Sequence, residues 1–378
     1  MDLSWSSEQQ QLRDSVQRWV TQSYPFEARR KLIASELGWS RDNWRRFAEL
    51  GWLGAALPED VGGIGGSAVE TLIVMEAFGR GLVTEPYLPA IVLGAGLIAD
   101  AGSAAQKDAL LGGVVEGKTL LALAYAEPTA RYETFNVTTK AAKKGGGYAL
   151  SGHKCVVING GEADRLIVSA RTAGAPRDAG GISLFLVDPK AKGVRLKSYP
   201  TVDGGRAAEV MLDDVAVAAG DLIGPADGGL PILEHALDRG IAAVAAEASG
   251  AMAVLHDTTL EYLKTRKQFG VALSTFQALQ HRMVDMFVHC EESKSMALKA
   301  ALEVDNDDAA ARARTLAAVK VQIGKAARSV GQEAVQLHGG IGMTMEYKVG
   351  HYFKRLSCIE TLFGDVDHHL ERFARAGS

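Results

Sequence analysis

The segment Thr265-Arg266-Lys267-Gln268-Phe269-Gly270 lies between two long stretches in which apolar residues recur at α-helical spacing. The first stretch starts after Gly228-Gly229 and runs to about Leu263, and the second runs from Thr275 to Leu302. Two further helical patterns cover Ala309–Leu337 and the region from Phe353 to the last residue. Four long helices with few internal breakers predict a helical bundle at this end of the chain.

The chain before this bundle changes character twice. From Ser7 to about Ala122 the apolar spacing is helical, and Ser7-x-x-Gln10 and Ser103-x-x-Gln106 have the pattern of capping boxes at helix starts. Between roughly Leu121 and Ile223, short β-rich runs are separated by Gly, Pro and Asp. We predict an α+β fold with an N-terminal α-helical domain over residues 1–120, a middle β-barrel domain over 121–225 and a C-terminal four-helix bundle domain over 226–378.

Composition narrows the class of partner. The chain has 378 residues, 47% of them hydrophobic, and a formal net charge of −4 with both signs interspersed, which favours a small-molecule substrate over nucleic acid or an anionic membrane. Neither a leader nor an apolar run long enough to span a bilayer is visible. The three cysteines are far apart and odd in number, which fits a reducing cytoplasm.

One carboxylate stands out on physical grounds. Glu247 is the only charged residue in the fifteen-residue segment from Ile241 to Leu255. Burial penalises the charged form of a carboxylate, which is how a glutamate becomes a useful base near neutral pH. The alternative is that Glu247 pairs with an Arg or Lys of a neighbouring helix or lies at a wet subunit interface. The residues alone leave both interpretations open.

The other glycine-rich and polar clusters lack the features of the binding sites that they resemble. Gly62–Gly66 lacks the Gly-Lys-Ser/Thr ending of a phosphate-binding loop, and His338–Gly342 follows a helix, which is unlike a nicotinamide site. The run Asp365–His369 has metal-capable side chains, but neighbours on a helix point about 100° apart, so we predict no metal site. No Gly-x-Ser-x-Gly nucleophile elbow is present.

The α–β–α order, combined with Thr265–Gly270, Phe276-Gln277 and Gln336-Leu-His-Gly-Gly340, resembles the acyl-CoA dehydrogenase family over essentially the whole chain. The resemblance implies FAD as the cofactor. In that family the arginine of the first motif contacts the pyrophosphate of FAD, its phenylalanine packs on the cofactor, the glutamine after the second phenylalanine contacts the adenine end, and the Gln-x-x-Gly-Gly segment comes from a neighbouring subunit. The corresponding residues are Arg266, Phe269, Gln277, Gln336, Gly339 and Gly340.

The resemblance assigns further FAD contacts to the middle domain and to the C-terminal loop. Ala126 and Ile158 fall where relatives place threonines against the isoalloxazine ring, so contacts here would depend more on backbone amides. Gly364 and Asp365 complete the implied set. These assignments, together with the neighbouring subunit's segment, imply an oligomer, with a tetramer expected.

The two usual positions of the family's base are empty. Phe363 occupies the glutamate position of the Tyr-Glu-Gly-Thr loop, and Gly240 occupies the alternative position on the preceding long helix. Glu247 lies two helical turns beyond Gly240, about 10 Å farther along the same face. We therefore predict Glu247 as the base, with Glu360 as a second choice.

The implied reaction is α,β-dehydrogenation of an acyl-CoA to a 2,3-enoyl-CoA, as in fatty acid β-oxidation. Glu247 would remove the α-proton, hydride would pass to flavin N5, and the backbone N–H of Phe363 would hold the thioester carbonyl, with Asp238 helping to bind the CoA-bearing substrate. An electron-transferring flavoprotein would reoxidise the FAD.

The departures from the family pattern resemble small subunits of heteromeric members, such as the pimeloyl-CoA dehydrogenase small subunit, so a homo- or hetero-oligomer with a larger acyl-CoA dehydrogenase subunit is expected. Two alternatives to a dehydrogenase stay open. One is a non-catalytic structural subunit that completes a partner's FAD site, and the other is a flavin monooxygenase on the same fold.

Overall fold

The computed structural model describes residues 4–376, and its internal contacts divide the chain into two compact units. The helical unit comprises Met1–Lys31, Ala68–Val83 and Ile241–Ser378, and the sheet unit comprises Leu32–Ser67 and Thr84–Gly240. Helix α7 (Gly229–Thr265) is continuous and contributes its residues from Ile241 onward to the helical unit.

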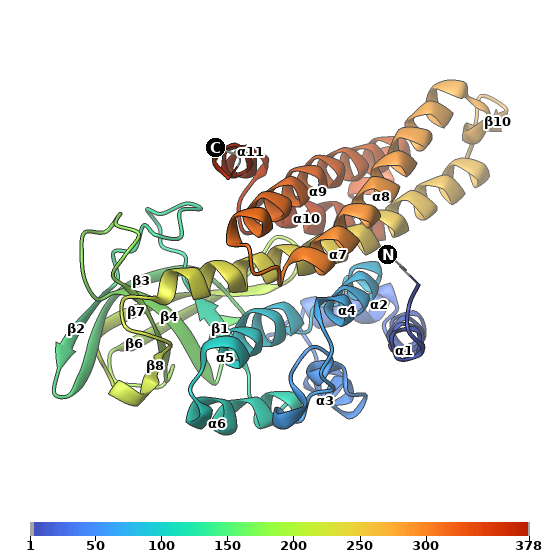
Figure 1. Ribbon diagram of the computed structural model, residues 1–378. Coiled ribbons are helices and arrows are strands. Elements are labelled where there is room, and N and C mark those ends of the chain that lie inside the picture. The colour runs from blue at the N-terminus through green and yellow to red at the C-terminus, as the bar shows by residue number, and fades with distance from the viewer. Residues whose placement is uncertain (1–3, 377–378) are drawn as a thin grey trace. The chain divides into compact units, whose positions relative to one another are not determined.

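The helical unit is built around one long buried helix, α9 (Ala309–His338). Helices α8 (Gln277–Glu303), α10 (Lys348–Thr361) and α11 (Val366–Arg375) each pack on α9, as can be followed in Figure 1. Leu316, Val319, Ile323 and Val330 are fully buried on α9 at the spacing of a core-facing stripe. Besides α7 and α2 (Phe26–Ile33), this unit has the helices α1 (Ser7–Ser23) and α4 (Ala68–Gly81), the strands β9 (Lys267–Gln268) and β10 (Val271–Ala272), and the short 3-10 turns η6 (Leu273–Thr275) and η7 (Gly339–Met343).

The last predicted helix is wrong in one respect, because it consists of two helices. Helix α10 ends at Thr361 and α11 begins at Val366. In the four-residue connection, Phe363 and Gly364 adopt left-handed φ angles of 62° and 114°, and the Asp365 side chain accepts a hydrogen bond from the backbone N–H of His368 at 2.9 Å. An N-cap and two positive φ values start a new helix where the apolar spacing alone indicated continuity.

The sheet unit has a single mixed sheet in which the strands follow the order β6-β7-β3-β2-β4-β5-β8, with β1 paired to β4. Strands β3 and β7 are the longest pair, run antiparallel and have register shifts between Leu150 and Gly152 and between Lys154 and Val157. The strands are β1 (Leu121–Ala124), β2 (Lys140–Lys144), β3 (Gly147–Ile158), β4 (Arg165–Arg171), β5 (Ile182–Val187), β6 (Val194–Pro200), β7 (Arg206–Val217) and β8 (Leu222–Ile223).

The β-rich runs of the sequence form β1, β3, β4, β5, β6 and β7. The structure adds the two-residue β8 and also β2, whose sequence Lys-Ala-Ala-Lys-Lys lacks the β-branched and aromatic residues that mark a strand. Leu150, Leu166, Val168, Phe185 and Val210 are fully buried in the core of this unit. Its helices are α3 (Arg41–Glu49), the π-helix η3 (Leu88–Ala95), α5 (Gly96–Ala101) and α6 (Ala104–Val115), with the short 3-10 turns η1 (Trp52–Gly54), η2 (Glu59–Val61), η4 (Gly160–Glu162) and η5 (Ala219–Asp221).

The helix starts predicted from the two capping patterns agree with the structure to within one residue. Ser103 and Gln106 form the predicted capping box of α6. At α1 the capping box uses Ser6 and Gln9, one residue earlier than predicted, because Ser6 is the residue with extended backbone geometry. The predicted α+β class, helical then strand-rich then helical, is confirmed, while the division into three domains stays a prediction. None of the helices in residues 4–376 has the length and apolar character needed to cross a bilayer.

Candidate functional site

Glu247 lies on the α7 segment of the helical unit and is 4% exposed. Its two carboxylate oxygens accept hydrogen bonds from the Arg355 guanidinium on α10, with Nε 2.6 Å from Oε1 and Nη2 2.6 Å from Oε2. Of the interpretations that the sequence leaves open, the pairing with an arginine of a neighbouring helix is confirmed. A bidentate guanidinium stabilises an ionised carboxylate and competes for the oxygens that a base would use.

The backbone around Glu247 is fixed by close contact between α4 and α7. A Cβ added to Gly79 on α4 would lie 1.9 Å from the Glu247 carbonyl oxygen, and one added to Gly250 would lie 2.0 Å from the Glu76 carbonyl oxygen. Only glycine permits this approach, so the two helices meet with no side chain between them. This backbone contact therefore fixes where the part of α7 that carries Glu247 lies against α4.

Glu360, the second choice for the base, is also paired. It is 8% exposed at the end of α10, and its Oε1 accepts a hydrogen bond from Arg328 Nη2 on α9 at 2.9 Å. Both carboxylates that the sequence proposed near this loop thus have arginine partners within the helical unit.

Phe363 follows α10 in the connection to α11, is 9% exposed and has a φ of 62°. A left-handed φ is unfavourable for a bulky residue and persists only where surrounding contacts impose it. Within residues 4–376, the Phe363 N–H donates to no acceptor, whereas the N–H groups of Leu362 and Gly364 bond to Cys358 and Thr361. The predicted donor to a thioester carbonyl is therefore unused by the chain itself.

Two buried side chains that sequence reasoning missed bind this connection. Lys320 on α9 is fully buried, and its Nζ donates to the carbonyl oxygens of Glu360 at 2.9 Å and Gly364 at 2.6 Å. His369 on α11 is also fully buried, and its Nε2 lies 3.0 Å from the Phe363 carbonyl oxygen. The available signal for Lys320 was a cation within the core-facing stripe of α9.

The first predicted FAD motif forms the β9–β10 hairpin and the start of α8. The Phe269 side chain is 90% exposed with a φ of 54°, and its ring meets only Phe276 edge-on, at 6.1 Å, among the ring contacts of the described residues. Arg266 and Gln277 are exposed as well, and the Arg266 guanidinium makes no hydrogen bond or ion pair to residues 4–376. An exposed aromatic beside a cation without a partner fits the packing and charge needs of an FAD diphosphate and ring system.

The second predicted FAD motif lies at the C-terminal end of α9. Gln336 is exposed, and Gly339 caps the helix with a φ of 67°. A Cβ added to Gly339 or to Gly340 would meet no atom within 4 Å. Packing inside the chain therefore does not require a glycine at 340, and the open space above it fits the close approach of an outside group such as a diphosphate.

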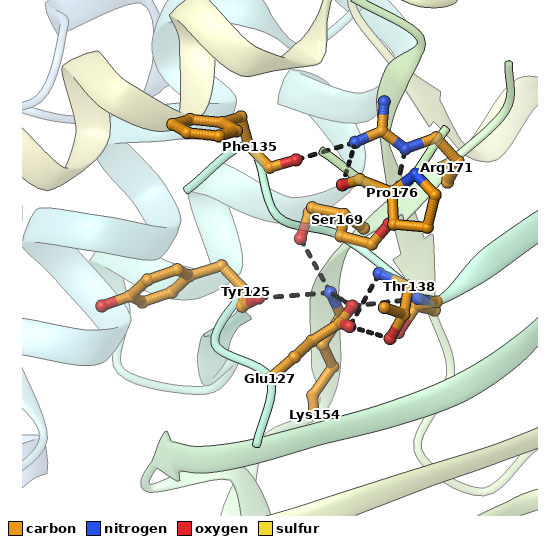
Figure 2. Close-up of polar contacts among 10 residues, drawn as sticks. Tyr125, Glu127, Phe135, Thr138, Lys154, Ser169, Arg171 and Pro176 are labelled. Atoms are coloured by element: carbon orange, nitrogen blue, oxygen red, sulfur yellow. Dashed lines mark hydrogen bonds and ion pairs between the residues drawn. The ribbon is translucent and has the colours of Figure 1, made fainter. Parts of the chain in front are cut away.

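In the sheet unit, the segments around Ala126 and Ile158 are brought together by a buried ion pair (Figure 2). Lys154 on β3 and Glu127 are 0% and 2% exposed, and Lys154 Nζ lies 2.7 Å from Glu127 Oε1. The same ammonium donates to the Tyr125 carbonyl at 3.2 Å and bonds Ser169 Oγ at 3.0 Å. Figure 2 shows these partners around the Lys154 nitrogen.

Backbone bonds extend this arrangement. The Cys155 N–H donates to the Ala126 carbonyl at 2.9 Å, so the two segments that the resemblance places against the flavin ring lie side by side. Next to Cys155 on β3, Val156 is 53% exposed and adopts a φ of 51°, an unfavourable geometry for a β-branched residue. Ala126 and Ile158 are half-buried. A strained, exposed backbone held by a rigid base is a common feature of ligand sites.

The charges of this pair are set by opposing effects. Burial raises the pKa of Glu127, but the Lys154 ammonium and hydrogen bonds from Lys154, Thr138 and Thr139 outweigh it and lower the pKa to about 2. Burial lowers the pKa of Lys154 to about 8, against the attraction of Glu127. Both groups are therefore ionised at neutral pH.

Arg171 holds the neighbouring loops in place. This side chain is 6% exposed and donates to the carbonyl oxygens of Phe135 at 2.7 Å, Pro176 at 2.8 Å and Gly180 at 2.6 Å (Figure 2 labels the first two partners). The loop after Glu127 is thus held in place by a guanidinium that donates to several backbone carbonyls.

Asp238, the predicted substrate-binding residue, is buried on α7 with 2% exposure. Among residues 4–376, no group of three or more His, Cys, Asp and Glu side chains is arranged to hold a metal ion. A polar cavity of about 350 Å³ in the helical unit is lined by Arg13, Glu76, Arg80, Lys294 and their neighbours, and it contains none of the predicted site residues.

Comparison with known proteins identifies the chain's relatives. It is 30% identical over 381 residues to the probable acyl-CoA dehydrogenase YngJ of Bacillus subtilis, covering 100% of this chain and 99% of that protein. It is 30% identical over 315 residues to CarC of Acetobacterium woodii, a subunit of a caffeyl-CoA reductase–Etf complex, covering 82% of each. The ChsE4–ChsE5 complex of Mycobacterium tuberculosis contains a chain of similar structure, with a TM-score of 0.89, 27% identity and coverage of 99% of this chain and 98% of that one.

The family models match nearly the full length. The N-terminal, middle and C-terminal domains of acyl-CoA dehydrogenases match residues 6–118, 122–215 and 227–377. FAD is the cofactor of this fold, and the exposed Arg266, Phe269 and Gly340 fit it. Relatives include proteins of Etf-linked and heteromeric assemblies. The chain therefore belongs to the acyl-CoA dehydrogenase family, and it is an FAD-dependent oxidoreductase that acts on the CH–CH group of acyl-CoA thioesters.

Proposed function

We propose that the chain converts an acyl-CoA thioester to a 2,3-enoyl-CoA at a site that includes the α10–α11 connection and Glu247. The α-carbon loses a proton to a base, the β-carbon loses a hydride, and a double bond forms between them. FAD supplies the hydride acceptor when it is bound. The observation that carries the proposal is the unused Phe363 N–H, held at a left-handed φ of 62° beside the end of α10.

The Phe363 amide would stabilise the charge that develops on the thioester carbonyl oxygen as the α-proton leaves. A fixed backbone donor needs no reorganisation during the reaction, and removing one such donor typically costs about 100- to 1000-fold in rate. Any residue except proline can supply this donor, so the loss of the family's usual glutamate at position 363 removes a base without removing the amide.

We propose Glu247 as the base, since it is the carboxylate of the buried segment of α7. Both of its carboxylate oxygens accept hydrogen bonds from Arg355, so proton transfer to Glu247 has to compete with the guanidinium. The test is anaerobic addition of a panel of acyl-CoAs to the FAD-loaded protein and to Glu247→Gln. Bleaching of the flavin by the parent protein, with at least about 100-fold slower bleaching in Glu247→Gln at unchanged FAD content, would support the assignment.

The same contact favours a second candidate function. Glu247 and Glu360, the two carboxylates proposed as the base, are tied to Arg355 and Arg328, and this pairing suits a structural partner that completes the FAD site of a larger subunit. The ChsE4–ChsE5 relative is a complex of two different chains. This function predicts no bleaching by the chain alone with any acyl-CoA, and bleaching with the partner that Glu247→Gln leaves unchanged.

The assembly and electron acceptor follow the family. We expect a tetramer, alone or with a larger acyl-CoA dehydrogenase subunit, and reoxidation by an electron-transferring flavoprotein, as in β-oxidation. We also expect a cytoplasmic location, since the three cysteines of the sequence are far apart and odd in number. Co-purification with the product of a neighbouring gene, followed by mass measurement of the complex, decides between the two assemblies.

A further inference from the structure

Lys320 is a buried cation that needs an explanation. Its side chain is fully buried on α9, where an apolar residue would avoid the cost of removing an ammonium group from water. Among the described residues no carboxylate lies within ion-pair distance of Lys320, and its hydrogen bonds go to two backbone carbonyls. A buried ammonium group that donates its hydrogen bonds to backbone carbonyls holds that part of the backbone in place.

The two carbonyls are at opposite ends of one short connection. The Glu360 carbonyl belongs to the last turn of α10, which has no further helical donors, and the Gly364 carbonyl lies just before α11. Lys320 therefore caps α10 and at the same time closes the turn that contains Phe363. A Cβ on Gly364 would lie 2.7 Å from His369 Nε2, so the turn and α11 are packed in direct contact.

His369 binds the carbonyl between those two. Because a carbonyl oxygen only accepts, Nε2 carries the proton that is donated to Phe363, and Nδ1 has no partner within residues 4–376. Burial, followed by the nearby Lys320 charge, lowers the pKa of His369 to about 3, so the ring stays neutral in this tautomer at any working pH. Its role here is that of a fixed donor.

We propose that Lys320 and His369 are positioning residues, which tie down the carbonyls of Glu360, Phe363 and Gly364 so that the Phe363 N–H is held ready for the substrate's thioester oxygen. The inference rests on the proposed function and extends it to the residues that orient the donor. The carbonyls of Glu360, Phe363 and Gly364 each accept a hydrogen bond from a buried side chain, while the Phe363 N–H is left without a partner among the described residues.

The test uses acetoacetyl-CoA as the probe. Its β-carbon is already a carbonyl, so it has no β-hydride to lose, and its enolate places negative charge on the same thioester oxygen. An enolate bound next to oxidised flavin gives a long-wavelength absorption band, which reports stabilisation of that oxygen without turnover and without a base from the protein. The band and the dissociation constant are measured in the FAD-loaded protein and its variants.

Four variants separate positioning from folding. Lys320→Met and His369→Leu remove the donors, His369→Gln keeps an N–H at nearly the same reach, and Lys325→Met, an exposed lysine on the same helix, is the matched control. We expect Lys320→Met and His369→Leu to raise the acetoacetyl-CoA dissociation constant at least about tenfold and to weaken the band, at unchanged FAD content. His369→Gln should restore most of the band, and Lys325→Met should match the parent.

The possible results distinguish failure of the positioning role from failure of the proposed function. A band of parental strength in FAD-loaded Lys320→Met and His369→Leu would overturn the positioning role and leave the proposed function intact. No band in the parent protein would overturn the proposed function, and the inference with it. If Lys320→Met does not fold, the comparison of His369→Leu with His369→Gln carries the test, and equal loss in both would contradict a donor role.

Discussion

Arg355 holds both carboxylate oxygens of Glu247 at 2.6 Å, and the arginine side chain is 21% exposed while that of the glutamate is 6% exposed. The carboxylate is thus the more deeply buried partner. Loss of the arginine would leave a buried charge without its counter-ion, whereas loss of both would leave a neutral gap.

A double-mutant cycle tests this asymmetry. We predict that Arg355→Met lowers the free energy of unfolding by about 3 kcal/mol, and that Glu247→Gln/Arg355→Met recovers part of that loss. Denaturant titration gives both numbers. The exposed pair of Arg375 and Glu371 in the same unit is the control, and Arg375→Met should change stability by less than about 1 kcal/mol. Equal effects of the two arginine variants would contradict the prediction.

The Glu127–Lys154 pair predicts an acid-dependent stability. The pKa of Glu127 is lowered from 4.5 to about 2, so its contribution is fully present above pH 4.5 and is lost as the pH falls from 4.5 to 2. Glu127→Gln should remove about 2 to 3 kcal/mol of pH-dependent stability in that window. Unfolding midpoints measured from pH 7 to 3 check it. An identical pH slope in the parent and the variant would show that the pair contributes nothing.

His369 predicts a second, higher window. Because its pKa is lowered from 6.5 to about 3, the unfolded chain binds the extra proton between these values, and stability falls as the pH drops from 6.5 toward 3. Burial is the main cause of the lowered pKa, and Lys320, His368 and Arg372 add to it. His369→Gln should flatten this part of the profile by up to about 5 kcal/mol. The Glu127→Gln variant, whose window lies lower, is the control.

Gly340 gives a test of FAD binding that is separate from folding. A Cβ added at this position would have no atom of the chain within 4 Å, so Gly340→Ala should leave the unfolding midpoint of the FAD-free protein unchanged. The same substitution should weaken FAD binding at least about tenfold, because the added methyl group would occupy the space into which the cofactor fits. Gly342→Ala is the contrast, because its Cβ would meet the Val335 carbonyl oxygen at 3.0 Å and should lower stability. FAD affinity that is unchanged in Gly340→Ala would exclude close approach at this glycine.

Much of the fold was readable because its signals are local. Apolar periodicity, capping patterns and β-rich runs found the long helices and six strands, and the polar β2 escaped because lysines carry no strand signal. The break at Phe363–Gly364 was hidden for a different reason. Its cause lies in tertiary contacts, a donor on α9 that is 44 residues from Gly364 and a donor on the following helix α11, which fix the connection at left-handed φ values.

Pairings within the candidate site were hidden in the same way. A lone glutamate in an apolar segment indicates burial, and Glu247 is buried, but the sequence cannot say which arginine meets it, since Arg355 is 108 residues away. Lys154 and Lys320 look like surface residues by type and are fully buried. A single charge at a core-facing position is the signal that would have found both.

Helix α9 has a consequence for the assembled enzyme. Lys320, which holds the Phe363 connection, and His338, where the helix reaches the Gln336–Gly340 motif, are separated by 18 residues of unbroken helix, a rod of about 27 Å. If the motif serves the flavin of an adjacent subunit, one rigid element joins the thioester-binding turn of one protomer to the cofactor of the next. Flavin occupancy and acyl-CoA affinity would then be thermodynamically linked across the oligomer, and partial loading with FAD would produce cooperative binding curves.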